Sequence, residues 1–83
     1  MSKKQKLLER LFSKPKDFEW NELRTLLTGF GYDEISGAGS RVKFYEPKSG
    51  SLISLHKPHP SNIVKEYILD QVIETLEGRG IRP

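Results

Sequence analysis

Apolar residues recur at helical spacing in three stretches of the chain, and each stretch predicts a helix. The first covers residues 3–12 and places its large apolar side chains on one side: Leu7, Leu8, Leu11 and Phe12. The second begins at Phe18 or Glu19, after Asp17 as its N-cap, and ends at Gly29. The core stripe predicted for this second helix is Trp20, Leu23, Leu26, Leu27 and Phe30.

The third helical stretch follows Pro58-His59-Pro60, where two prolines impose an extended chain. It begins within residues 61–65 and ends near Glu77, with Gly78 as its C-cap. Its predicted core stripe is Val64, Tyr67, Ile68, Val72, Ile73 and Leu76. We expect the remaining residues, 79–83, to form a polar tail that frays.

Between the second and third helices, polar and apolar residues alternate, and this period predicts strands within Gly37–Glu46 and Ser51–Pro60. Pro47–Gly50 is the turn between them, and Tyr32–Ser36 is a first, short strand. Successive strand residues point to opposite faces of a sheet. The predicted buried face carries Val42, Phe44, Ile53 and Leu55. The predicted open face carries Arg41, Lys43, Tyr45, Ser54 and His56.

This order of helix, helix, three strands and helix predicts an α+β fold, a three-stranded antiparallel sheet with helices packed on one face. The central αβββα order is that of double-stranded-RNA-binding domains. With 83 residues the chain has room for one domain, which we divide into a helical extension (1–16), a core (17–78) and the tail. Seven residues are predicted to form the centre of the core: Trp20, Leu23, Leu27, Phe44, Leu55, Ile68 and Val72.

Composition narrows the function classes without choosing one. The net charge of +3 and the isoelectric point of about 9.3 permit an anionic partner such as a nucleic acid. No apolar run approaches the ~18 residues of a membrane span, and charged residues interrupt the N-terminal segment where a signal peptide would be apolar. The chain has no cysteine, which excludes disulfides and fits a reducing compartment. We therefore expect a cytoplasmic protein without a membrane partner or a cofactor.

The open face of the predicted sheet carries side chains suited to chemistry on RNA. His56 can take or give a proton near neutral pH, and Arg41 on the neighbouring strand is a fixed cation. RNA carries its own nucleophile, the 2′-hydroxyl, so cleavage needs only a proton acceptor, a proton donor and positive charge. Tyr45 offers a stacking surface for an unpaired base. Three lysines could position phosphates: Lys43, Lys57 and Lys65.

The same residues also have plain structural interpretations. His56 and His59 would need a third ligand and a converging geometry to bind a metal, so we expect no metal site. His59, between two prolines, is typical of an exposed loop. The Gly37–Gly39 loop could cradle a phosphate with its amides, although most such glycines only form turns. No Walker loop, dinucleotide-binding fingerprint or Ser-His-Asp order is present.

Four motifs follow one another along the chain. They are Trp20-Asn-Glu-Leu23 with Leu26, Leu27 and Gly31; Gly39-Ser40-Arg41 with Phe44; His56-Lys-Pro-His-Pro60 with Lys65; and a closing helix that ends Glu77-Gly78. Their order resembles the HicA family of toxins from about Trp20 to Gly78. The resemblance implies a double-stranded-RNA-binding-like fold and a metal-independent ribonuclease that cleaves messenger RNA and arrests growth. It also implies a HicB-like antitoxin as partner, which we expect to cover the open sheet face.

One motif departs from the family pattern. The family carries Gly-Ser-His, with that histidine catalytic, and this chain has Arg41 at the position. Arginine stays protonated, so it cannot act as a general base. We therefore predict that His56 is the acid/base residue and that Arg41 stabilises charge. The predicted RNA-binding residues are Gly39, Ser40, Lys43, Tyr45, Lys57, His59 and Lys65. The alternatives are a non-catalytic RNA-binding domain of the same fold and a protein-interaction module.

Overall fold

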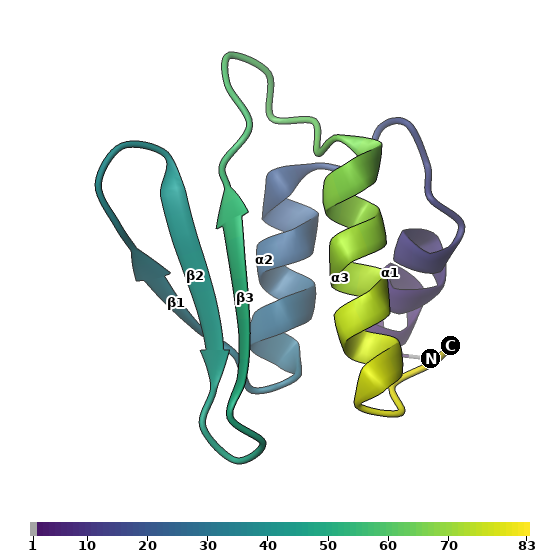
Figure 1. Cartoon of the computed structure of the whole chain (residues 1–83). Helices are drawn as coiled ribbons and strands as arrows, with labels where there is room; N and C mark the ends of the chain where they lie inside the picture. Colours follow the sequence, from purple (N-terminus) through teal and green to yellow (C-terminus); the bar gives the residue numbers. More distant parts are fainter. Residues whose placement is uncertain (1) are drawn as a thin grey trace.

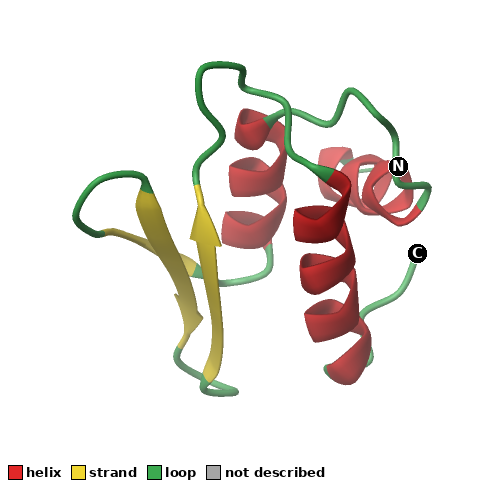
Figure 2. Cartoon of the chain, turned by 45° about the horizontal axis from the view of Figure 1, so that its top comes forward, coloured by secondary structure: helices red, strands yellow, loops and turns green. Residues whose placement is uncertain are grey.

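The structure, a computed structural model, describes residues 2–83 (Figures 1 and 2). Its helices and strands are α1 (Lys3–Phe12), α2 (Trp20–Gly29), β1 (Asp33–Ser36), β2 (Arg41–Glu46), β3 (Ser51–His56) and α3 (Glu66–Gly78). The strands form one antiparallel sheet in the order β1-β2-β3. The predicted α+β fold is therefore confirmed.

The helices lie in two layers on one side of the sheet. α2 and α3 pack against the sheet, and α1 packs on the back of α2 and α3 (Figure 1). The other face of the sheet carries no helix of the described chain. The predicted division of the strands is confirmed, because Val42, Phe44, Ile53 and Leu55 are buried whereas Arg41, Lys43, Tyr45, Ser54 and His56 are exposed.

The core is centred on Phe44 of β2, which is fully buried. The ring of Trp20 from α2 packs on it with a centroid separation of 5.9 Å. All seven predicted core residues are at most 5% exposed. Two further buried aromatic residues, Phe18 and Tyr32, lie outside the helices and strands and were not predicted to be in the core. The Tyr32 hydroxyl keeps a partner in the Ser51 hydroxyl, at 2.8 Å.

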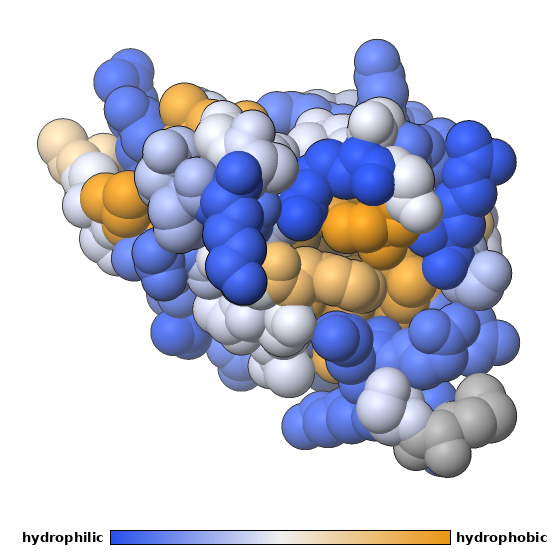
Figure 3. All heavy atoms as spheres, turned by 90° about the horizontal axis from the view of Figure 1, so that it is seen from below, coloured by the Kyte–Doolittle hydropathy of each residue, from blue (hydrophilic) through white to orange (hydrophobic). Residues whose placement is uncertain are grey.

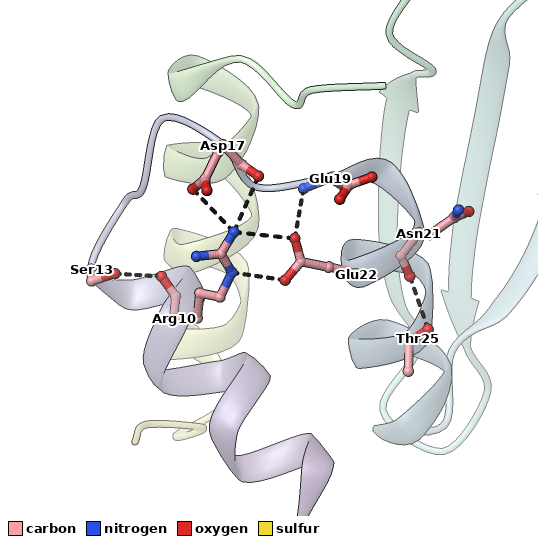
Figure 4. Close-up of polar contacts among 7 residues, drawn as sticks. All are labelled: Arg10, Ser13, Asp17, Glu19, Asn21, Glu22 and Thr25. Atoms are coloured by element: carbon pink, nitrogen blue, oxygen red, sulfur yellow. Dashed lines mark hydrogen bonds and ion pairs between the residues drawn. The ribbon is translucent and has the colours of Figure 1, made fainter. Parts of the chain in front are cut away.

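The predicted N-cap of α2 is wrong. Asp17 lies outside the helix, and its side chain and carbonyl accept hydrogen bonds from Arg10 of α1 (Figure 4). The N-cap is Glu19, whose backbone N–H donates to the Glu22 side chain at 3.0 Å. The same Glu22 carboxylate accepts a hydrogen bond from Arg10 Nε at 2.7 Å. Arg10 therefore joins α1 to the start of α2, an arrangement that a local capping rule does not detect.

α3 begins at Glu66, just after the predicted range of residues 61–65, and it ends near Glu77 as predicted, but its C-cap is Arg79 and not Gly78. Tyr67, placed in the core stripe, is 61% exposed. Gly78 is still helical, and Gly80 has the positive φ that ends the helix, with Ile81 N–H donating to the Leu76 carbonyl at 2.9 Å. The expectation that the tail frays is wrong for residues 79–81. Arg79 donates to the buried Glu46 carboxylate at 3.2 Å, and Ile81 packs against the core.

α1 contributes to the same core as the other elements. Leu7, Leu8 and Leu11 are all buried against α2 and α3.

Apolar atoms also reach the surface on the side that faces down in Figure 1, where they are ringed by hydrophilic residues (Figure 3). Half-buried Phe30, at the end of α2, is covered by Lys4, whose Nζ lies 4.9 Å from the ring centroid. The candidate site is positioned by α2, α3 and the sheet.

Candidate nucleic-acid interface

The strand register places Arg41 beside His56. These residues are direct partners across β2 and β3, at the end of the sheet that faces up in Figure 1. Both side chains are exposed on the open face. Direct cross-strand partners have Cβ atoms about 4.5–5.5 Å apart, so a fixed cation stands next to a group that can transfer protons. Arg41, predicted on the strand next to that of His56, is thus its direct neighbour.

The loop from residues 57–65 is held at both ends. At its start, Lys57 N–H donates to the Ser40 carbonyl at 2.8 Å, which ties it to the turn before β2. At its end, Val64 N–H donates to the Phe18 carbonyl and Trp20 N–H donates to the Asn62 carbonyl, both at 2.8 Å. Because Val64 is also buried, the loop leaves the sheet and reaches α3 along a fixed path.

A pocket of about 210 Å³ lies between the end of β3, this loop and the start of α3. It is lined by Ser40, His56, Lys57, Pro58, His59, Lys65, Tyr67 and Ile68. Five predicted site residues thus meet in one place: Ser40, His56, Lys57, His59 and Lys65. A neighbouring hollow shares part of this lining and adds Gly39 and Asn62. We call the pocket of about 210 Å³ the histidine pocket.

The histidine pocket is electropositive. Two lysines line it and no carboxylate does. The N-terminus of α3 lies beside it, with Lys65 as N-cap and Glu66, the acidic residue of the first turn, outside the lining. The positive end of a helix dipole favours anions, typically by 0.3–1 kcal/mol at an exposed site. Two imidazoles within reach of a bound anion can exchange protons with it, so the pocket suits a phosphodiester.

The structure does not bring every predicted site residue into this pocket. Arg41 and Lys43 line a separate hollow on the open face, next to Ile35 and Gly37. Tyr45 lies further down β2, paired with Leu52. It is four residues after Arg41 along the strand, or about 13 Å. The candidate residues therefore divide into the histidine pocket and an open-face group of Arg41, Lys43 and Tyr45.

Sequence reasoning missed Tyr67 as a pocket residue, because it was placed in the core stripe of α3. The buried residues of α3 already form a complete stripe without it: Ile68, Leu69, Val72, Ile73 and Leu76. Within a helix, a residue just before the first stripe position points about 100° away from it. The sequence thus contained a signal, since including Tyr67 widens the stripe beyond one face.

Within residues 2–83, no three side chains of His, Cys, Asp or Glu gather in a way that could hold a metal ion. None of the helices described is both long enough and apolar enough to span a membrane.

The fold and the pocket define a small α+β domain with a basic, histidine-lined site at one end of its sheet. Comparison with protein families matches residues 20–77 to the HicA toxin of bacterial toxin–antitoxin systems. The match covers well over half of the chain, so this protein belongs to the HicA toxin family. Comparison with curated proteins gave no match, and comparison with solved structures gave none either.

Proposed function

We propose that this toxin is an endoribonuclease that cleaves messenger RNA without a metal ion, and that cleavage takes place at the histidine pocket. One observation carries the proposal: His56 and His59 line the same pocket as Lys57 and Lys65. Arg41 adds a further cation as the cross-strand partner of His56. This set supplies proton transfer and positive charge, which is what attack by a 2′-hydroxyl on its own phosphodiester requires.

The reaction would be an internal transfer. One imidazole removes the proton of the 2′-hydroxyl as its oxygen bonds to the adjacent phosphorus. The bond to the 5′-oxygen breaks, and that oxygen takes a proton from the second group, which leaves a cyclic phosphate and a 5′-hydroxyl. We assign the two proton transfers to His56 and His59, because both imidazoles line the pocket and histidine is the most frequent general acid or base. Arg41, always protonated, stabilises the charge on the phosphate oxygens.

The remaining candidates would hold the strand. Lys57 and Lys65 are placed to contact phosphates next to the reacting one, and Lys43 to contact them on the open face. Gly39 and Ser40 line the neighbouring hollow, where backbone amides could bind a phosphate. Tyr45 would stack on a base that crosses the open face.

The partner that silences the toxin would be a HicB-like antitoxin bound across the open face. This face exposes Ile35 and Leu52, each about half accessible (50% and 54%), beside the cations Arg41 and Lys43. The exposed apolar groups lie on the two outer strands and the cations on β2 between them, and exposed apolar groups of this kind suit a protein partner. An antitoxin there would also cover Arg41 and His56.

The test is incubation of the pure protein with single-stranded RNA in EDTA. We expect cleavage that leaves a cyclic phosphate, and we expect His56→Ala to lose roughly 10²–10⁴-fold in rate. Growth arrest on induction should fall with it, while circular dichroism shows an unchanged fold. His59→Ala tests whether His59 is the second proton-transfer group, a role that the sequence alone did not favour. If His56→Ala cleaves as fast as the unchanged protein, the assignment is wrong.

The same experiment separates the two alternatives. A gel shift without cleavage would support a non-catalytic RNA-binding domain. Neither cleavage nor a shift would support a protein-interaction module. If cleavage disappears in Arg41→Ala but survives in His56→Ala, catalysis depends on charge at the position where the family has its histidine.

A further inference from the structure

Tyr67 is the most exposed large hydrophobic side chain of the described chain, at 61%. It lies in the first turn of α3 and lines the histidine pocket. The core stripe of α3 is complete without it, so the ring contributes little to the hydrophobic core. An exposed aromatic ring beside two lysines and two histidines is suited to binding a nucleic-acid base next to its phosphate.

The packing of α3 on the edge of the sheet fixes where the ring lies. Gln71, one turn after Tyr67 on the same face of α3, donates to the Ser54 carbonyl of β3 at 3.1 Å. β3 and α3 run in opposite directions (Figure 1). From the Gln71–Ser54 contact, one turn back along α3 reaches Tyr67, and two residues onward along β3 reach His56. These are similar distances, about 5.4 and 6.7 Å. Tyr67 is thus placed opposite His56, in agreement with the lining of the pocket.

We propose that Tyr67 is the platform on which one base of single-stranded RNA stacks, with the adjacent phosphate held by the lysines of the histidine pocket. The inference rests on the proposed function and adds to it the residue that fixes the position of the base. Stacking accepts any base, because every base has a π-face, so Tyr67 would orient the strand without reading its sequence. Tyr45, about 13 Å from Arg41 along β2, cannot serve this pocket in the same way.

The probe is a short 2′-O-methyl RNA, which lacks the attacking hydroxyl, with the fluorescent base 2-aminopurine placed in turn at each position. We expect the fluorescence at one position to fall on binding to the unchanged protein, as it does when this base stacks. Tyr67→Leu should abolish that fall and weaken binding roughly 5- to 100-fold. Tyr67→Phe keeps the ring and should behave as the unchanged protein does.

Two further variants make the result specific. Thr25→Ala, at an exposed position of α2 outside the histidine pocket and the neighbouring hollow, should leave affinity and fluorescence unchanged. Lys65→Ala should lower the slope of log affinity against log salt, whereas Tyr67→Leu should lower affinity at every salt concentration with the same slope.

The outcomes distinguish this inference from the proposed function. If Tyr67→Leu binds as tightly as the unchanged protein while Lys57→Ala binds less tightly, RNA uses the pocket and Tyr67 is not the platform. The inference also fails if Tyr67→Phe loses as much affinity as Tyr67→Leu, or if Tyr45→Leu is the variant that restores fluorescence. An unchanged protein that binds no RNA would overturn both.

Discussion

Glu46 is the only buried charged residue among those described, at 3% exposure. Its carboxylate accepts hydrogen bonds from the backbone N–H groups of Lys48 and Ser49 and from Arg79. Hydrogen bonding by the Ser49 side chain, then by these two N–H groups, with the Arg79 charge as a smaller contribution, lowers the pKa of Glu46 below its ordinary value of 4.5. One side chain thus closes the β2–β3 turn and anchors the C-terminal tail.

Glu46→Gln tests this role through pH. A carboxyl with a lowered folded pKa adds stability above its unfolded pKa, and this contribution disappears as pH falls through the folded value. We therefore expect the variant to be less stable at pH 7 and the difference from the unchanged protein to shrink below about pH 4.5. Urea unfolding across pH measures this. Glu74→Gln, at an exposed position of α3, should show no such convergence.

Phe44→Ala tests the centre of the core. Truncating a buried phenylalanine costs about 3–5 kcal/mol in the free energy of unfolding, a large share of a small domain's stability. We expect the variant to be unfolded or nearly so by circular dichroism and thermal melting. Tyr45→Ala removes the exposed neighbour on the same strand and should melt close to the unchanged protein. A stable Phe44→Ala protein would contradict the packing described for β2.

At the residue scale, the sequence predicted side-chain direction well and local partners poorly. Alternation along β2 and β3 placed Phe44 inside and His56 outside, because strand geometry leaves only two faces. It could not assign Asp17 to Arg10 or Glu46 to Arg79, since tertiary packing and not a local rule brings each pair together. Nor could it bring His59 to His56, because the path of the 57–65 loop depends on hydrogen bonds to the turn before β2 and to the start of α2.

At the scale of elements, the junction of α1 and α2 depends on Arg10. Its guanidinium binds Glu22 and Asp17 (Figure 4) and lies 5.6 Å from the Phe18 ring centroid. The hydrogen bonding that Arg10 donates to the Glu22 carboxylate lowers the pKa of Glu22 and raises the pKa of Arg10. Helix positions were predictable from periodicity, whereas this connection between helices was not, since it is set by tertiary packing.

A double-mutant cycle of Arg10→Ala and Glu22→Ala measures the junction. The pair is partly exposed, so solvent screening limits its coupling to about 0.5–1 kcal/mol. Each single variant should lose more than this, because Arg10 also holds Asp17 and Glu22 also caps α2. Chemical denaturation provides the four stabilities. A coupling of zero would mean that the Arg10–Glu22 pair does not stabilise the junction. Lys14 and Asp70, an exposed ion pair, are a matched comparison.

For the molecule as a whole, the cations of the candidate site are divided between two surfaces that meet at the Arg41–His56 pair. Lys57 and Lys65 lie at the histidine pocket, and Lys43 lies on the open face. The net charge of +3 gives a modest general attraction for RNA. Substitution of individual lysines is therefore needed to show which surface the RNA strand follows.

Salt dependence answers that question. Each phosphate contact on a single strand adds about 0.7 to the slope of log affinity against log salt. Lys57→Ala should lower the slope by about that amount, whatever the RNA sequence. Lys43→Glu should weaken binding for all sequences alike if the strand also crosses the open face. Lys48→Glu, in the turn at the other end of the sheet, is the control and should change the slope little. Salt-independent affinity would contradict both surfaces.

The loop of residues 57–65, tied at one end to Ser40 and at the other to Phe18 and Trp20, has a consequence for how a ligand is received. Fixing a flexible backbone residue costs about 1–2 kcal/mol of conformational entropy, and here folding has already met much of that cost. The site is in this sense preorganised, so association needs little induced fit and can retain more of its contact energy as affinity. Amide hydrogen exchange at Lys57, Val64 and Trp20 should accordingly be slow before any ligand is added.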